Sequence, residues 1–220
     1  MPSRDKPTPV VTTFQWVPPF AQGLVRDLRV RWAIEEAGGN YDVALIDFKQ
    51  VKGADHRRAQ PFGQVPCFQE GEVAMFESGA IVFHIAESSR VLMPIDPVGR
   101  TRAITWMFAA LNSVEPMIAE LAVVDIFEAD AAWAKLRRPG LVEQVRKRLA
   151  ELAAWLGEEP YLEGAFTAGD LLMATVLRNL RQTDLVAEQP ILAAYLARCE
   201  MRPAFQRALK AHMAVFDTVA

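Results

Sequence analysis

The spacing of hydrophobic positions changes along the chain, and the change divides it into two regions. Between residues 9 and 92, short runs rich in β-branched and aromatic residues alternate with helix-like segments. The order βαβ, an irregular stretch and then ββα predicts a mixed α/β domain. The expected strands are 10–16, 41–48, 65–69 and 72–76, and the expected helices are 24–37 and 78–88, with a short helical turn at 55–60.

Beyond the proline-bearing connector at 93–97, every segment has a helical pattern. The expected helices are 100–129, kinked at Pro116, then 140–156, and three more that start near Thr167, Pro190 and Pro203. Thr167 and Asp170 have the spacing of a capping box, in which the hydroxyl accepts an N–H of the third helical residue and the carboxylate reaches back. The predicted domains are therefore 1–92, a linker at 93–97, and an all-α domain at 98–220.

Composition and charge narrow the classes of protein. Of 220 residues, 51% are hydrophobic and 23% charged, which allows sizeable cores and excludes a disordered chain. The net charge of −3 and the lack of a dense basic cluster argue against nucleic acid as a partner. We expect no membrane segment, because no apolar stretch approaches the roughly 18 residues that a span needs. The polar N-terminus also lacks a secretory signal pattern.

Cysteine and histidine usage adds two expectations. Cys67 and Cys199 are far apart in the sequence and no CxxC pattern is present, which fits a reducing compartment without structural disulfides. His56, His84 and His212 are scattered without the spacing of metal ligands, so we expect no metal site.

The strongest local signal is Val65-Pro66, followed eleven residues after Pro66 by Glu77-Ser78. Proline has no backbone N–H, and an X-Pro bond can adopt the cis form at a cost of about 0.5–1 kcal/mol. A cis bond at Pro66 turns the backbone of Val65 outward, where it can pair with an extended peptide. Glu77 and Ser78 add a carboxylate and a hydroxyl at the start of an apolar helix. Together these features predict a binding site for a small peptide.

With these segments in this order, the chain resembles the cytosolic glutathione transferases, of a bacterial type. Three motifs carry the resemblance: Gln60–Pro66, which follows the pattern Asn/Gln-Pro-Phe-Gly-Gln-Val-Pro, Glu77–Ile81, and the segment Phe166–Asp170. The resemblance covers nearly the whole length. It implies a thioredoxin-like N-terminal domain followed by a C-terminal helical bundle, and a cytoplasmic homodimer that acts in detoxification.

The resemblance also implies glutathione as co-substrate and a partner for each part of this peptide. Val65 is expected to pair with the cysteinyl backbone, as in the addition of a strand. Ser78 and the helix N-terminus are expected to bind the γ-glutamyl carboxylate. Glu77 and Gln64 are the candidates for the ammonium group, and Lys52 for the glycyl carboxylate.

Each assignment has a plainer alternative. Pro66 can be an edge-strand proline in the trans form, and Ser78 can serve only as a helix cap. Lys52 and Gln64 can be ordinary surface residues. Cys67 is expected to be a packed strand residue and not a reactive thiol.

Residues 14–24, where this family usually carries the group that activates the thiol, contain no tyrosine, serine or cysteine. A free thiol titrates near pH 8.5, so activation is needed at neutral pH. The catalytic residue is therefore unknown, and three explanations remain open. In the first, backbone N–H groups at the start of the helix expected from Gly23–Leu24 stabilise the thiolate, with Trp16 or Gln22 shaping the pocket. In the second, a side chain reaches in from elsewhere. In the third, the protein binds glutathione without efficient transfer. The side chains considered for this role are Thr13, Gln15, Asn112 and Ser113.

The second substrate is expected beside an apolar wall, which favours hydrophobic electrophiles. The predicted function is conjugation of glutathione to such electrophiles, or reduction of peroxides. The alternative is a glutathione-binding protein of the same fold with little or no turnover. On the plainer interpretation, the residues of this wall are interdomain core. The wall consists of Trp16, Phe20, Met107, Ala110, Leu111 and Val114. Trp16 is also the residue expected nearest the thiol.

Overall fold

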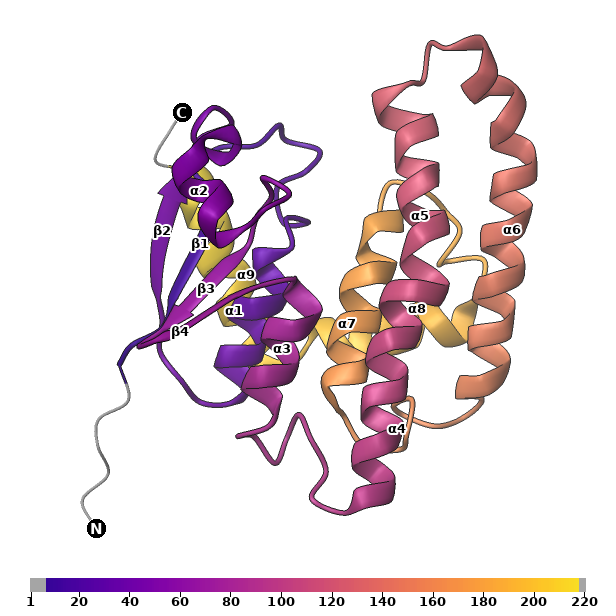
Figure 1. The fold of residues 1–220 in the computed structure, drawn as a ribbon. Helices are drawn as coiled ribbons and strands as arrows, with labels where there is room; N and C mark the ends of the chain where they lie inside the picture. The colour runs from indigo at the N-terminus through magenta and orange to yellow at the C-terminus, as the bar shows by residue number, and fades with distance from the viewer. Residues whose placement is uncertain (1–6, 218–220) are drawn as a thin grey trace. The chain divides into compact units, whose positions relative to one another are not determined.

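The protein is described by a computed structural model over residues 7–217, which divide into two compact units (Figure 1). The first unit comprises residues up to Met93 together with the segment that starts at Arg202. The second unit is Pro94–Met201.

A four-stranded sheet forms the centre of the first unit, with strand order β2-β1-β3-β4. The two N-terminal strands pair in parallel, and the other two pairs are antiparallel. This order, with a helix crossing between the parallel strands, is the thioredoxin-like arrangement. The strands are β1 (Val10–Phe14), β2 (Asp42–Ile46), β3 (Cys67–Glu70) and β4 (Val73–Phe76).

Helix α1 (Asp27–Glu36) is the central helix of the first unit, and its residues from Asp27 to Ile34 are all buried. It is covered on several sides because both α3 (Ser78–Ala86) and α9 (Pro203–Asp217) pack against it. The first unit also contains a 3₁₀-helix (Gln50–Lys52) and the short helix α2 (Ala54–Ala59), which has no buried residue.

Helix α9 belongs to the first unit, whereas the sequence had placed all of 98–220 in the helical domain. Its apolar face explains the difference. The ring of Phe205 packs on Trp32 of α1 at 4.8 Å between centroids. Arg202 also donates to Glu36 at 2.7 Å. The last helix therefore completes the α/β unit.

The segment between β1 and α1 is a series of turns, although the sequence predicted a helix from residue 24. Gly23 has φ of +77°, a left-handed conformation that suits glycine and that a right-handed helix excludes. The Leu24 N–H bonds back to Ala21 O at 3.0 Å, and the helix begins only at Asp27.

The second unit is helical, as predicted. Its long first helix is distorted by a π-helical segment (Ala109–Val114) that ends two residues before Pro116, close to the predicted kink. Helix α6 starts eight residues before the predicted residue 140 and contains Pro139. All ten residues of α7 are buried. The helices are α4 (Pro97–Phe108), α5 (Glu115–Ala122), α6 (Ala132–Leu156), α7 (Ala168–Leu177) and α8 (Pro190–Glu200), with a second π-helical segment at Val123–Phe127.

The continuous helix Pro97–Phe127 is long and apolar enough to cross a membrane, judged by length and composition alone. This corrects the expectation that no such stretch exists, which overlooked the segment because Glu115 and Glu120 interrupt its apolar residues. A helix in the core of a globular unit passes the same test, and this one packs against α6 and α7. The most apolar window of this helix is 39% buried, so packing within the second unit covers part of its apolar surface.

Candidate functional site

The loop before β3 leaves one backbone segment outside the sheet. The Val65–Pro66 peptide bond is cis, and β3 starts only at Cys67. Within residues 7–217, no hydrogen bond joins the Val65 backbone to another residue. Because each peptide group carries a donor and an acceptor, the half-buried Val65 is available to pair with an extended ligand.

The carbonyl groups next to Val65 are held by side chains from the preceding helical turns. Lys52 Nζ donates to Gly63 O at 3.0 Å, and His56 Nε2 lies 2.7 Å from Gln64 O. Gln60 Oε1 accepts from the Gln64 N–H at 3.2 Å. Lys52 was predicted as a carboxylate ligand, and here its ammonium group also fixes the loop. The contribution of His56 was missed, because no sequence spacing links it to the loop.

The register of the sheet brings the two predicted motifs together. Cys67 pairs with Phe76, so the antiparallel continuation places Val65-Pro66 opposite Glu77-Ser78. Glu77 is exposed and has φ of +68°, which for a non-glycine residue costs about 1–3 kcal/mol and is frequent at functional sites. It directly precedes α3, whose first residue is Ser78.

Ser78 is buried and its hydroxyl is held by an arginine that the sequence analysis missed. Arg29 of α1 is 3% exposed, and its Nη1 donates to Ser78 Oγ at 3.2 Å. A buried guanidinium next to the N-terminus of α3 makes this point of the site strongly favourable for a carboxylate. The available signal was a pair of arginines, Arg29 and Arg31, within the otherwise apolar run 28–34.

A pocket of about 380 Å³ lies beside these residues and includes three of the predicted ones, Lys52, Gln64 and Val65. Arg26, at the entry to α1, adds a second cation to the lining. The pocket therefore combines two cations with the Val65 backbone, which suits an anionic peptide.

Aromatic side chains form another part of this pocket and extend beyond it. Phe14 and Phe48 line it and lie 4.7 Å apart between ring centroids. Trp16 meets Phe48 edge to face at 6.4 Å and is 44% exposed. Phe48, two residues after β2, was not predicted as a site residue.

The N–H groups proposed to stabilise a thiolate are engaged inside the first unit. The Gly23 N–H donates to His212 Nε2 at 3.2 Å, and the Leu24 N–H donates to Ala21 O. The Thr13 hydroxyl is enclosed, while Gln15 is exposed. The explanation based on Gly23 and Leu24 therefore loses both donors, and no activating group is assigned.

The predicted wall for the second substrate draws on both units. Trp16 and Phe20 belong to the first unit, and the other four residues belong to the second. Met107, Ala110 and Val114 are buried, and Leu111 is half-buried. Asn112 and Ser113, the alternative side chains for the thiol, are exposed in the second unit. The wall stays a prediction.

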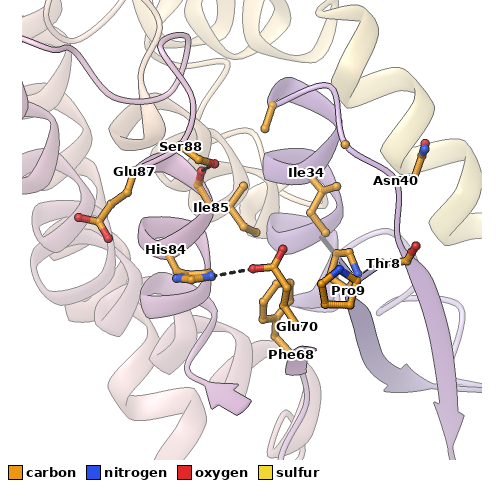
Figure 2. A pocket seen from close by; sticks show the side chains of 13 residues that line it. Thr8, Pro9, Ile34, Asn40, Phe68, Glu70, His84, Ile85, Glu87 and Ser88 are labelled. Carbon is orange, nitrogen blue, oxygen red and sulfur yellow. Dashed lines mark hydrogen bonds and ion pairs between the residues drawn. The ribbon is translucent and has the colours of Figure 1, made fainter. Parts of the chain in front are cut away.

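A second pocket of the first unit, about 540 Å³, lies near the C-terminal ends of α1 and α3 (Figure 2). In it His84 of α3 points toward Glu70 of β3, with 3.2 Å between Nε2 and Oε2, while Ile34 and Phe68 contribute apolar surface. None of the predicted glutathione-binding residues lines this pocket. The candidate site is therefore the pocket at Val65.

Neither cysteine nor metal chemistry has support at this site. Burial raises the pKa of the Cys67 thiol to about 11, so this group stays protonated at neutral pH. Among residues 7–217, no group of three or more His, Cys, Asp or Glu side chains could hold a metal ion.

Residues 10–87 match the family model described as "Glutathione S-transferase, N-terminal domain". The chain is 28% identical over 213 residues to "Glutathione S-transferase 4" of Zea mays, which covers 90% of this chain and 91% of that protein. It is 27% identical over 192 residues to "Glutathione S-transferase F14" of Arabidopsis thaliana. That alignment covers 79% of this chain and 75% of the relative.

Solved structures share the fold over nearly the whole chain. A glutathione transferase from Burkholderia graminis, crystallised with two glutathione molecules per subunit, has a TM-score of 0.81 at 23% identity, covering 93% of this chain and 88% of that one. Glutathione transferase F7 from Populus trichocarpa has a TM-score of 0.76 at 22% identity. The superposition covers 94% of this chain and 99% of that one.

These findings confirm the predicted fold class, a thioredoxin-like domain followed by a helical region. The N-terminal region thus matches a glutathione transferase domain, and over most of its length the chain is similar in sequence to proteins of that name. The sequence relatives named above come from plants, so the bacterial type is not confirmed.

Proposed function

We propose that this protein is a glutathione transferase that conjugates glutathione to hydrophobic electrophiles. One observation carries the proposal: the unpaired Val65 backbone lies opposite a buried Ser78 that is hydrogen-bonded to Arg29. Val65 offers two backbone hydrogen bonds to a peptide, and Ser78 with Arg29 offers a positively charged site for a carboxylate. The two are separated by the distance between adjacent strands. The match of residues 10–87 to the transferase N-terminal domain supports the same conclusion.

Each polar group of glutathione has a candidate partner in the site. Its cysteinyl N–H and C=O pair with Val65, and its γ-glutamyl carboxylate binds Ser78 with the charge of Arg29 close by. Lys52 faces the glycyl carboxylate from the other side of the pocket, while Glu77 and Gln64 hold the ammonium group. The glutathione-bound structure of the Burkholderia graminis relative supports this choice of ligand.

The residues of this chain perform binding and orientation in the reaction. The bound thiolate attacks the electrophilic carbon of the second substrate, a bond from sulfur to carbon forms, and the leaving group departs with its electron pair. The positive charges of Arg26, Lys52 and Arg29 favour the thiolate over the thiol by attraction through the pocket. We further propose that the protein is a cytoplasmic homodimer of a bacterial type that acts in detoxification, and that it also reduces organic peroxides.

Steady-state assays test the proposal. We expect turnover of 1-chloro-2,4-dinitrobenzene that saturates with glutathione, and slower turnover of cumene hydroperoxide. Lys52→Gln should raise the KM for glutathione by about tenfold, because an ion pair to the glycyl carboxylate is lost. Arg90→Gln is the matched control: this exposed cation follows α3 and does not line the pocket, so its KM should equal that of the wild type. Absence of turnover with both substrates, despite measurable glutathione binding, would favour the non-catalytic alternative.

A further inference from the structure

Helices α1 and α9 are joined by a buried series of hydrogen bonds, called here the hydrogen-bonded chain. It ends at the Gly23 turn beside the candidate site. His212 of α9 accepts from the Gly23 N–H through Nε2 at 3.2 Å, and its Nδ1 lies 3.1 Å from Asp27 Oδ2. Arg31 Nε donates to the same carboxylate oxygen at 2.7 Å. The three side chains are at most 1% exposed. Such a chain fixes the positions of all its members, because no water can replace a broken link at low cost.

The partners determine which imidazole nitrogen carries the proton. A backbone N–H can only donate, so Nε2 must be the acceptor and Nδ1 must carry the proton that goes to Asp27. Burial raises the pKa of Asp27, but its interactions with His212 and Arg31 lower this pKa by more, so the carboxylate is ionised and can accept both hydrogen bonds.

Gly23, at the end of this chain, directly precedes three residues that line the candidate site. Gly23 adopts the left-handed conformation, and the next three residues, Leu24, Val25 and Arg26, all line the pocket at Val65. Because these residues directly follow Gly23, a shift of its peptide group displaces them. The Gln22 side chain also ties this turn to Val17 O at 3.3 Å.

We propose that His212, oriented by Asp27, is a positioning residue that holds the Gly23 turn and thereby sets the wall formed by Leu24–Arg26 against bound glutathione. Helix α9 delivers His212 from a rigid base, since Phe205 packs on Trp32 and Arg207 Nε donates to Glu35 Oε2 at 2.7 Å. The placement of the imidazole does not depend on catalysis. Its effect on turnover rests on the proposed transferase function.

Measurements on the wild-type protein test the hydrogen-bonded chain without any activity assay. The ¹⁵N spectrum of His212 should show a neutral ring protonated at Nδ1, and the Gly23 amide should exchange slowly with solvent. A ring protonated at Nε2, or a Gly23 amide that exchanges as fast as those of exposed loops, overturns the proposal. These readouts stand even if the protein has no transferase activity.

Variants then test the consequence for the site. His212→Phe keeps the size of the ring and removes both nitrogens, so the Gly23 amide should exchange several-fold faster. The kcat with 1-chloro-2,4-dinitrobenzene should fall about tenfold to a hundredfold, as expected when a reacting group is displaced by about 1 Å. His212→Gln places an amide oxygen within reach of Gly23 and should recover most of the lost kcat.

Leu149→Ala is the control for general stability. Leu149 is a buried residue of α6 in the second unit, so its truncation should lower the unfolding temperature while leaving kcat near the wild-type value. If Leu149→Ala lowers kcat as much as His212→Phe at equal loss of stability, His212 acts through general stability and the positioning role is wrong. The same conclusion follows if His212→Phe leaves both Gly23 exchange and kcat unchanged.

Discussion

At the scale of single residues, the sequence predicted the site residues that belong to a recognisable motif. It missed the residues whose partners come close only when the chain folds. Val65 and Ser78 were found because proline restricts its neighbour and because a serine opens an apolar helix. Arg29 and His212 were not found, although each makes a hydrogen bond within the first unit. Their partners lie 49 and 189 residues away in the sequence, and no local pattern encodes such a distance.

Asp27 gives a pH-dependent prediction. Its pKa is lowered in the folded protein, so the stability contributed by the ionised carboxylate is present above the unfolded pKa of about 3.9 and is lost as the pH falls through the lower folded value. The urea midpoint of Asp27→Asn should therefore lie below that of the wild type at neutral pH, and the gap should narrow at acidic pH.

The control for this experiment is Asp55→Asn, since the Asp55 side chain is 94% exposed. Its urea midpoint should stay close to the wild-type value at every pH. A gap between wild type and Asp27→Asn that does not change with pH would show that the charge of Asp27 is not what stabilises the cluster.

At the scale of secondary structure elements, helix ends were predicted well where a cap has a sequence signature. The capping box of α7 is present, with Asp170 Oδ2 accepting from the Thr167 N–H at 2.9 Å. Thr167 Oγ1 accepts from the N–H of Gly169, the second helical residue, at 3.2 Å. The start of α1 was placed three residues early, because Gly23 adopts a left-handed conformation that its local sequence did not indicate.

Thr167→Ala should lower the free energy of unfolding by about 0.5–2 kcal/mol, because an N-cap hydroxyl is lost from a fully buried helix. Thr167→Ser keeps the hydroxyl and should stay within about 0.5 kcal/mol of the wild type. Urea unfolding followed by circular dichroism measures both. Equal stability of Thr167→Ala and the wild type would exclude a stabilising role for the cap.

At the scale of the whole molecule, the fold class followed from the order of segments, but the division into units did not. Helix α9 is amphipathic, but an apolar face alone does not indicate which of the two cores it packs against. The ring of Phe205 on Trp32 and the bonds of Arg202 and Arg207 to α1 assign it to the first unit. The predicted glutathione-binding residues all lie in that unit.

The central claim is that this first unit binds glutathione through Val65 and Ser78. Titration calorimetry with glutathione tests it most directly, using the wild type, Ser78→Ala and the matched control Ser88→Ala, which alters a serine just beyond the C-terminal end of α3. We predict that the wild type binds, that Ser78→Ala weakens binding about tenfold through loss of a hydrogen bond to a carboxylate, and that Ser88→Ala binds as the wild type does. A wild type that releases no binding heat, or equal affinities for Ser78→Ala and the wild type, would contradict the account.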